Sequence, residues 1–276
     1  MEFLVLGPVE VHDPRTGARG APSGAKQRAL LGALVSRSGQ LLSTDRLIDE
    51  LWGDAPPTAA ANALQAHVTR LRRLLHGVDG ADHITTSPRG YRLPAPSSDA
   101  QAFHRLSAEG RAVLPTDPVH ACELLRRALT LWRGAPLDGA TGGPLCTAEA
   151  DRLAELRLVT EEAFHEARLR IPHTDPRPLT DTLERLTADH PTRERLYDLL
   201  MVALCRGGRQ WEALGVYERA RHRLRTELGV EPGPALRARV AEILDVPGTP
   251  AVLLDLGSEI ARLRSQIENL HVRLNA

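Results

Sequence analysis

Residues 47–91 constrain the possible folds of this chain more than any other stretch. They begin with a segment typical of a short helix that ends at Trp52, before two consecutive prolines interrupt any further helix. Residues 59–76 then carry apolar side chains at helical spacing, which predicts a longer helix. The segment that follows alternates around a turn at 87–90, as a β-hairpin does. The predicted order is therefore helix, turn, helix and two-stranded hairpin.

The longer predicted helix separates an apolar stripe from a cationic face. The stripe consists of Leu64, Val68, Leu71 and Leu75. The opposite side presents Asn62, Ala66, Thr69, Arg70 and Arg73. No acidic residue lies between 59 and 76, so this face suits a DNA groove, where guanidinium groups reach guanine edges or phosphates. With the hairpin as a wing, the segment predicts a winged helix-turn-helix; the alternative is a surface helix whose arginines only keep it soluble.

The surrounding residues predict further elements of the same domain. Residues 3–6 and 9–11 are rich in β-forming side chains and favour a small antiparallel sheet. Ser23 is the expected cap of a first helix, and Thr58 is the expected cap of the longer basic helix. Another helix is expected after Ser43 and Thr44, with an inward face made of Leu47, Ile48, Leu51 and Trp52.

The predicted hairpin, residues 83–93, carries Arg89 near its tip and Arg92 close behind. Arg89 is placed to enter a minor groove, where a narrow A·T-rich stretch concentrates negative potential. Residues 94–98, with two prolines and two serines, resemble a linker. Residues 1–96 hold 11 basic and nine acidic side chains, so any DNA-facing charge is local to the basic helix and the hairpin.

From residue 99 to about 246 the pattern predicts one helix after another. Two of these helices share small residues around a larger one, namely Ala121, Leu125 and Ala128, and Ala213, Tyr217 and Ala220. The second, preceded by a turn at Gly208, looks like part of a tetratricopeptide hairpin. Stacked helical pairs of this kind offer concave surfaces to protein partners. A helical scaffold without such a ligand is the alternative.

The last segment, 247–276, combines a linker with a heptad pattern. Its seam consists of Leu253, Leu256, Ile260, Leu263, Ile267, Leu270 and Leu274. Isoleucine at position a and leucine at position d favour a parallel two-stranded coil, which predicts a homodimer formed through the tail. The alternative is a terminal helix that packs on its own chain.

The composition is that of an ordinary globular protein, with 276 residues, 42% hydrophobic content and no net charge. The three cysteines are far apart and indicate neither a disulfide framework nor a metal knuckle, so a reducing cytoplasm is expected. No apolar run approaches the roughly 18 residues that span a membrane. The chain also lacks a phosphate-binding loop, a metal-ligand spacing and a hydrolase motif. We therefore expect no enzyme activity, no cofactor and no metal.

Several segments resemble a known bacterial family. Three segments resemble the OmpR-type winged-helix DNA-binding domain: LIDELWG at 47–53, NALQAHVTRLRRLL at 62–75 and RGYRL at 89–93. Residues 99–246, above all the stretch that starts HPTRERLYDLL at His190, resemble the bacterial transcriptional activation domain. This order is similar to that of the SARP family of antibiotic-regulatory activators. The expected domains are 1–96, 97–246 and the tail.

The resemblance implies an activator of a secondary-metabolite (antibiotic) gene cluster. Such an activator binds direct heptameric repeats of double-stranded promoter DNA near the −35 element and contacts RNA polymerase holoenzyme. Matched residue by residue, Ala66 and Arg70 would read bases and Arg89 would make the wing contact. The DNA backbone would be contacted by Asn62, His67, Thr69 and Arg72. Two of these positions depart from the pattern, because Asn62 and Thr69 stand where OmpR-type domains often have arginine. Neither a receiver domain nor the ATPase module of larger members is expected. The rival interpretation is a helical-repeat adaptor whose winged domain binds protein rather than DNA.

Overall fold

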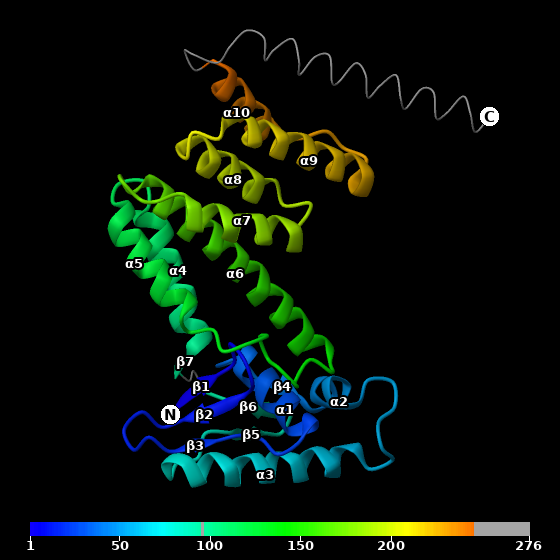
Figure 1. Cartoon of the computed structure of the whole chain (residues 1–276). Helices are drawn as coiled ribbons and strands as arrows, with labels where there is room; N and C mark the ends of the chain where they lie inside the picture. The colour runs from blue at the N-terminus through cyan, green and yellow to red at the C-terminus, as the bar shows by residue number, and fades with distance from the viewer. Residues whose placement is uncertain (95–96, 246–276) are drawn as a thin grey trace, which may run out of the picture. The chain divides into compact units, whose positions relative to one another are not determined.

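The computed structural model describes residues 1–94 and 97–245, which form two compact units. Unit 1 is Met1–Pro172, and unit 2 begins at His173 (Figure 1). Each unit is described by itself. The predicted heptad seam lies outside the described residues.

Unit 1 opens with a four-stranded sheet in the order β3-β2-β1-β7. Its strands are β1 (Glu2–Leu4), β2 (Glu10–His12), β3 (Arg19–Gly20) and β7 (Ser97–Ser98). The antiparallel pairing of β1 with β2 confirms the predicted N-terminal sheet. The linker prediction was wrong at Ser97 and Ser98, which pair in parallel with β1. Ser98 also caps the helix that follows, since its Oγ accepts a hydrogen bond from the Gln101 amide at 3.2 Å.

The three helices of the predicted helix-turn-helix region are α1 (Ala25–Ser36), α2 (Thr44–Trp52) and α3 (Ala60–Asp79). They are followed by the hairpin of β5 (Thr85–Ser87) and β6 (Gly90–Arg92). A short strand that the sequence did not predict, β4 (Leu42–Ser43), pairs with β6, so the sheet order is β4-β6-β5. The winged-helix prediction is therefore confirmed (Figure 1).

Two of the predicted helix caps were wrong. The N-cap residues of α1 and α3 are Gly24 and Ala59, and neither helix has a side-chain cap. Ser23 and Thr58 each lie one residue too early for their hydroxyls to occupy the capping position. Helix α2 does have a cap, because the Ser43 Oγ accepts a hydrogen bond from the Arg46 amide at 3.3 Å.

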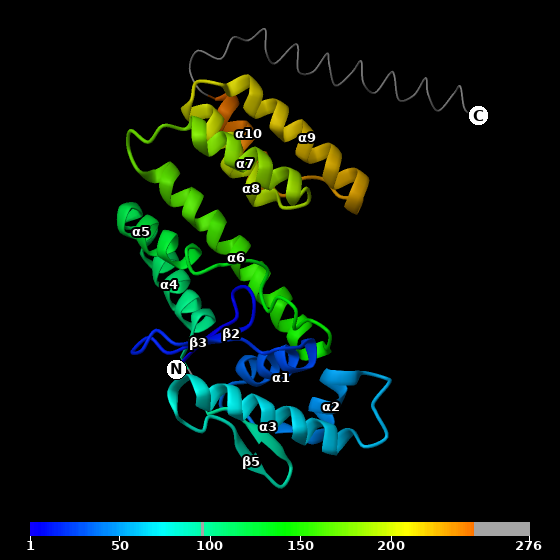
Figure 2. The ribbon, with the colours of Figure 1, turned by 60° about the horizontal axis from the view of Figure 1, so that its bottom comes forward.

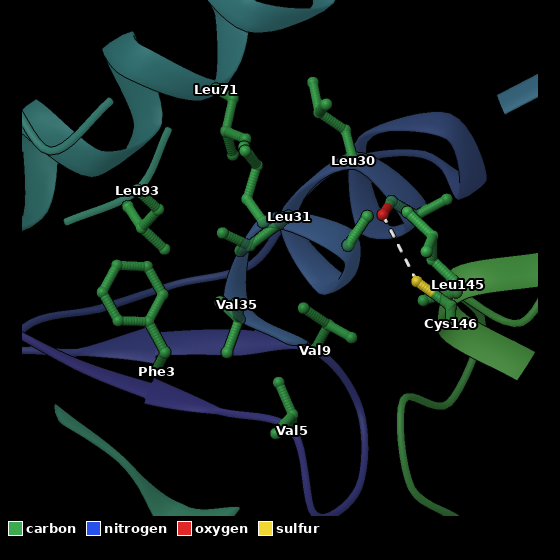
Figure 3. Packing of buried hydrophobic residues seen from close by; sticks show 14 of the residues in the cluster. Phe3, Val5, Val9, Leu30, Leu31, Val35, Leu71, Leu93, Leu145 and Cys146 are labelled. Carbon is green, nitrogen blue, oxygen red and sulfur yellow. Dashed lines mark hydrogen bonds between the residues drawn. The ribbon is translucent and has the colours of Figure 1, made fainter. Parts of the chain in front are cut away.

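The core of the winged-helix part of unit 1 lies between α1, the apolar side of α3 and β1–β2 (Figure 3). The predicted stripe of Leu64, Val68, Leu71 and Leu75 is buried there, and Leu47 and Leu51 of α2 join it. Ile48 and Trp52 are only half-buried at its margin. Five residues of the same core come from a later part of the chain: Leu137, Ala140, Leu145, Cys146 and Ala150.

The rest of unit 1 is helical: α4 (Asp99–Val113), α5 (Pro118–Leu129) and α6 (Pro144–Arg170). The predicted packing residues Ala121, Leu125 and Ala128 are buried. Gly110 of α4 permits the close approach of α5, because a Cβ atom there would lie 2.7 Å from the Leu125 Cγ.

Unit 2 contains α7 (Arg177–Asp189), α8 (Glu194–Arg206), α9 (Gln210–Leu228) and α10 (Pro234–Leu244). Ala213 and Ala220 are buried and Tyr217 is half-buried, as the small-residue pattern predicted. Gly208 makes the turn between α8 and α9 at a φ of 72°, a value that favours glycine. The prediction of successive packed helices is confirmed. Within the part of the chain that the structure describes, no helix is both long and apolar enough to cross a bilayer.

Candidate nucleic-acid interface

Helix α3 turns one polar face to solvent. We call this the basic face of α3: Asn62, Gln65, Ala66, Thr69, Arg70 and Arg73, all of which are exposed. The face exists because the four leucine and valine residues of the stripe bind the other side of the helix to the core. Figure 2 shows α3 along one edge of unit 1 with the β5–β6 hairpin beside it. We call this hairpin, residues 85–92, the wing.

The charge of this surface is not neutralised locally. Arg70, Arg73, Arg89 and Arg92 are exposed, and no carboxylate of residues 1–94 or 97–245 forms an ion pair with them. Asp79, at the end of α3, is occupied elsewhere, since its Oδ2 lies 2.8 Å from the His83 Nε2. The four guanidinium groups are therefore available to an anionic partner such as a phosphate backbone.

The tip of the wing is held against α2 and β4. Gly90 has a φ of 154°, and a Cβ atom there would overlap the Leu42 carbonyl oxygen, so only glycine fits between β6 and β4. The Thr44 amide donates a hydrogen bond to the Arg89 carbonyl at 3.1 Å. These contacts place the Arg89 side chain next to the helix-turn-helix while leaving it exposed.

Arg72 lies at the edge of the basic face, on the flank of Gln65 and away from Arg70. Its side chain is half-buried on the flank of α3 that faces the wing. Its Nε and Nη2 donate to the Ile84 carbonyl at 3.2 and 2.8 Å, and Nη2 also donates to the Thr86 Oγ1 at 2.6 Å. The guanidinium group expected to bind a DNA phosphate is thus already bound to the hairpin.

His67 lies on the other flank of α3, half-buried against Trp52. The two ring centroids are 6.0 Å apart, and the His67 Nδ1 is buried without a hydrogen-bond partner among the described residues. Burial lowers the pKa of His67, and the charges of Arg70 and Lys26 lower it further. His67 is therefore neutral at neutral pH and presents no charge to a phosphate.

Two features of this region had signals that the sequence interpretation missed. Gln65 is exposed on the basic face, and its spacing from Asn62 and Thr69 already placed it there. A glutamine amide can pair with an adenine edge. Glu50 is 1% exposed and follows Leu47 by three residues, so its helical position on the inward face of α2 was also evident.

Glu50 connects the winged helix to α6. Its Oε2 accepts from the Leu145 amide at 2.6 Å and its Oε1 from the Cys146 amide at 3.0 Å, at the N-terminus of α6. A Cβ atom on Gly143 would overlap the Glu50 carbonyl oxygen, so a glycine is needed for this approach.

A second buried carboxylate, Asp99, joins the start of α4 to the residues that follow β1. It accepts hydrogen bonds from the Val5 and Leu6 amides at 2.8 and 3.1 Å, with the Arg133 Nη2 at 3.6 Å. Burial raises the pKa of Asp99 despite these partners. No sequence signal pointed to this contact.

Comparison with known proteins assigns the winged-helix region and the helical region that follows it to known domain families. Residues 20–93 match the family model described as transcriptional regulatory protein, C terminal, and residues 98–244 match the bacterial transcriptional activator domain. The transcriptional regulator RedD of Streptomyces coelicolor is 40% identical over 250 residues, which cover 88% of this chain and 70% of RedD. The regulatory protein AfsR of the same organism is 40% identical over 268 residues, 95% of this chain and 26% of AfsR.

A solved structure is similar as well. Mycobacterium tuberculosis EmbR, in complex with a low affinity phosphopeptide, aligns with a TM-score of 0.81 and 34% identity. The alignment covers 88% of this chain and 64% of EmbR. The chain thus spans between about a quarter and seven-tenths of the lengths of these three relatives. The matches confirm the family resemblance that the sequence motifs indicated. The chain belongs to the SARP family of transcriptional regulators, in which an OmpR-type winged-helix domain is followed by a bacterial transcriptional activator domain.

Proposed function

We propose that this transcriptional regulator binds double-stranded promoter DNA sequence-specifically, with α3 in the major groove and the wing in the adjacent minor groove. One observation carries the proposal: the exposed arginines of α3 and the wing have no carboxylate partner in the described structure. A surface helix kept soluble by mixed charges would pair such groups with neighbouring acids. The absence of acidic side chains from 59 to 76 supports the same reading.

Arg70 and Ala66 are the proposed base readers. Arginine binds the O6 and N7 atoms of guanine with two hydrogen bonds, and alanine leaves room for the thymine methyl group. Asn62, Thr69 and Arg73 are the proposed phosphate contacts of α3, and Arg89 and Arg92 are those of the wing. His67 contributes at most a neutral hydrogen bond, because its pKa is lowered.

The proposed target is a promoter of a secondary-metabolite (antibiotic) gene cluster, with direct repeats near the −35 element. Direct repeats require two winged domains side by side, and the predicted tail coil would supply the homodimer. The packed helices of the activator domain are the proposed contact for RNA polymerase holoenzyme. This part of the proposal is supported by the family match and by relatives named as regulators.

Salt dependence tests the proposal directly. A promoter fragment is first chosen by footprinting the promoters next to the chain's own gene, and affinity is then measured by fluorescence anisotropy between 50 and 200 mM salt. Arg73→Ala and Arg89→Ala are each expected to reduce the slope of log K against log salt by about one, the share of a single phosphate contact. Arg70→Ala is expected to cost roughly 1 to 3 kcal/mol on the repeats and much less on random duplex.

Arg127→Ala, an exposed arginine of α5, is the matched control and should leave slope and affinity unchanged. Equal losses on repeats and random duplex would remove Arg70 as a base reader. A folded protein whose duplex binding is weak and independent of salt would favour the adaptor over the DNA-binding activator.

A further inference from the structure

We propose that Arg72 is a positioning residue that fixes the wing to α3, and that it does not bind a DNA phosphate. The proposal rests on the DNA-binding function above and specifies how its two contact elements are held together. Three observations carry it: the hydrogen bonds of the guanidinium group, its place on the helix and the sheet order of the wing.

The hydrogen bonds occupy the planar end of Arg72. Two of its nitrogens converge on the Ile84 carbonyl, and one of them also reaches Thr86. Ile84 is 4% exposed and packed in the core of unit 1, so this anchor is part of the folded interior. The planar guanidinium group of arginine fixes the orientation of the groups to which it donates hydrogen bonds. The ammonium group of a lysine does not fix that orientation.

The position on the helix separates Arg72 from the base-reading side chain. At 100° per residue, Arg70 and Arg72 lie 200° apart around α3, on opposite flanks. His67 and Trp52 pack along the Arg70 flank, whereas the Arg72 flank faces the wing. Arg72 therefore does not share the orientation that would bring Arg70 to a base edge.

The sheet order explains why the wing needs such a residue. Its two strands have three residues each, and a hairpin of this size is marginal by itself. Strand β6 is secured by β4, but β5 is the edge strand. Among the described residues, Arg72 is the one side chain outside the hairpin that donates a hydrogen bond to the 84–87 segment. Arg72 thus fixes the free side of the wing to α3.

Hydrogen exchange of the 276-residue chain without DNA tests the contact itself. Arg72→Lys and Thr86→Val should each raise the exchange rates of the amides of residues 85–92 and leave those of α3 unchanged. Thr86→Val removes one hydroxyl from an exposed position while keeping a β-branched side chain, so it reports on the contact even where Arg72→Ala is poorly folded. Unchanged exchange in both variants would overturn the proposal.

A double-mutant cycle on the duplex tests the role. If Arg72 acts through the wing, Arg72→Ala should weaken binding about tenfold, and this loss should disappear in a background that already carries both Arg89→Ala and Arg92→Ala. An independent phosphate contact would instead keep its tenfold effect in that background, which would overturn the proposal. Arg73→Ala is the matched control and should weaken binding by the same factor with and without the two wing substitutions.

The two hypotheses fail separately. If the wild-type chain does not bind duplex in a salt-dependent way, the DNA-binding function is lost while the exchange result still decides whether Arg72 holds the wing. Rescue of the tenfold loss by Arg72→Lys would indicate a charge contact with the backbone and would also count against the positioning role.

Discussion

At the scale of single residues, the buried histidine of α6 links stability to pH. His165 is 5% exposed, and burial, with a smaller contribution from the Arg168 charge, lowers its pKa to about 4. The folded chain therefore keeps His165 neutral at a pH where the unfolded chain, with a pKa near 6.5, already binds a proton. Its contribution to stability is complete above pH 6.5 and is lost as the pH falls towards 4.

This difference predicts an acid-dependent loss of stability. Over the window from pH 6.5 to about 4, the His165 proton should remove about 3 kcal/mol of unfolding free energy. Urea denaturation at pH 7, 5.5 and 4 measures it by comparing the wild type with His165→Gln, which does not titrate. The variant should lose correspondingly less stability between pH 7 and 4. Parallel losses in the two proteins would show that another group binds the proton.

At the scale of elements, α2 and α6 are joined by a carboxylate placed at a helix terminus. The first amides of a helix have no partner within it, and the positive end of the helix dipole favours an anion. Glu50 satisfies two such amides of α6 from a neighbouring helix. The orientation of α2, which leads directly into α3, is thereby tied to the start of α6.

Glu50→Ala should cost about 3 kcal/mol, because two charge-assisted hydrogen bonds are lost and two buried amides remain unpaired. Thermal and urea unfolding measure the change. Asp49→Ala is the matched control, since Asp49 is the adjacent acidic residue of α2 but is exposed, and it should change stability by less than about 0.5 kcal/mol. Comparable losses in both variants would mean that the α6 contact contributes nothing specific.

At the scale of the whole molecule, the winged helix shares one core with the start of α6 and the segment before it. Leu137 and Ala140, from the segment before α6, and Leu145, Cys146 and Ala150 of α6 itself lie in the same buried cluster as the leucines of α1 and α3 (Figure 3). The compact unit accordingly extends to Pro172. The domain boundary at residue 96 remains a prediction of where one domain family ends and the next begins. It does not coincide with the end of the compact unit.

A chain that ends at residue 96 should therefore be unstable. It would expose the side of α1 that packs on α6 and would leave the Val5 and Leu6 amides without Asp99. We expect its thermal unfolding, followed by circular dichroism, to be broad or absent where the full chain unfolds cooperatively. A cooperative transition at the unfolding temperature of the 276-residue chain would refute this prediction, as would undiminished affinity for duplex.

The sequence by itself determined the helices, the hairpin and the exposed side of α3. These features depend on residues a few positions apart: the 3.6-residue period of the leucines and the turn at 87–90. The family motifs lie within the same local segments, which is why the sequence alone predicts the order of winged helix and activator domain.

Only the tertiary structure decided which polar groups meet across the fold. Asp99 and Val5 are 94 residues apart, and Glu50 and Leu145 are 95 apart, so no local pattern links them. Arg72 is one of three nearby arginines on α3, and its spacing separates it from Arg70 but does not show that the wing lies within hydrogen-bond distance. A side chain's role depends on what the folded chain brings within hydrogen-bond distance of it, and periodicity reports only the direction in which it points.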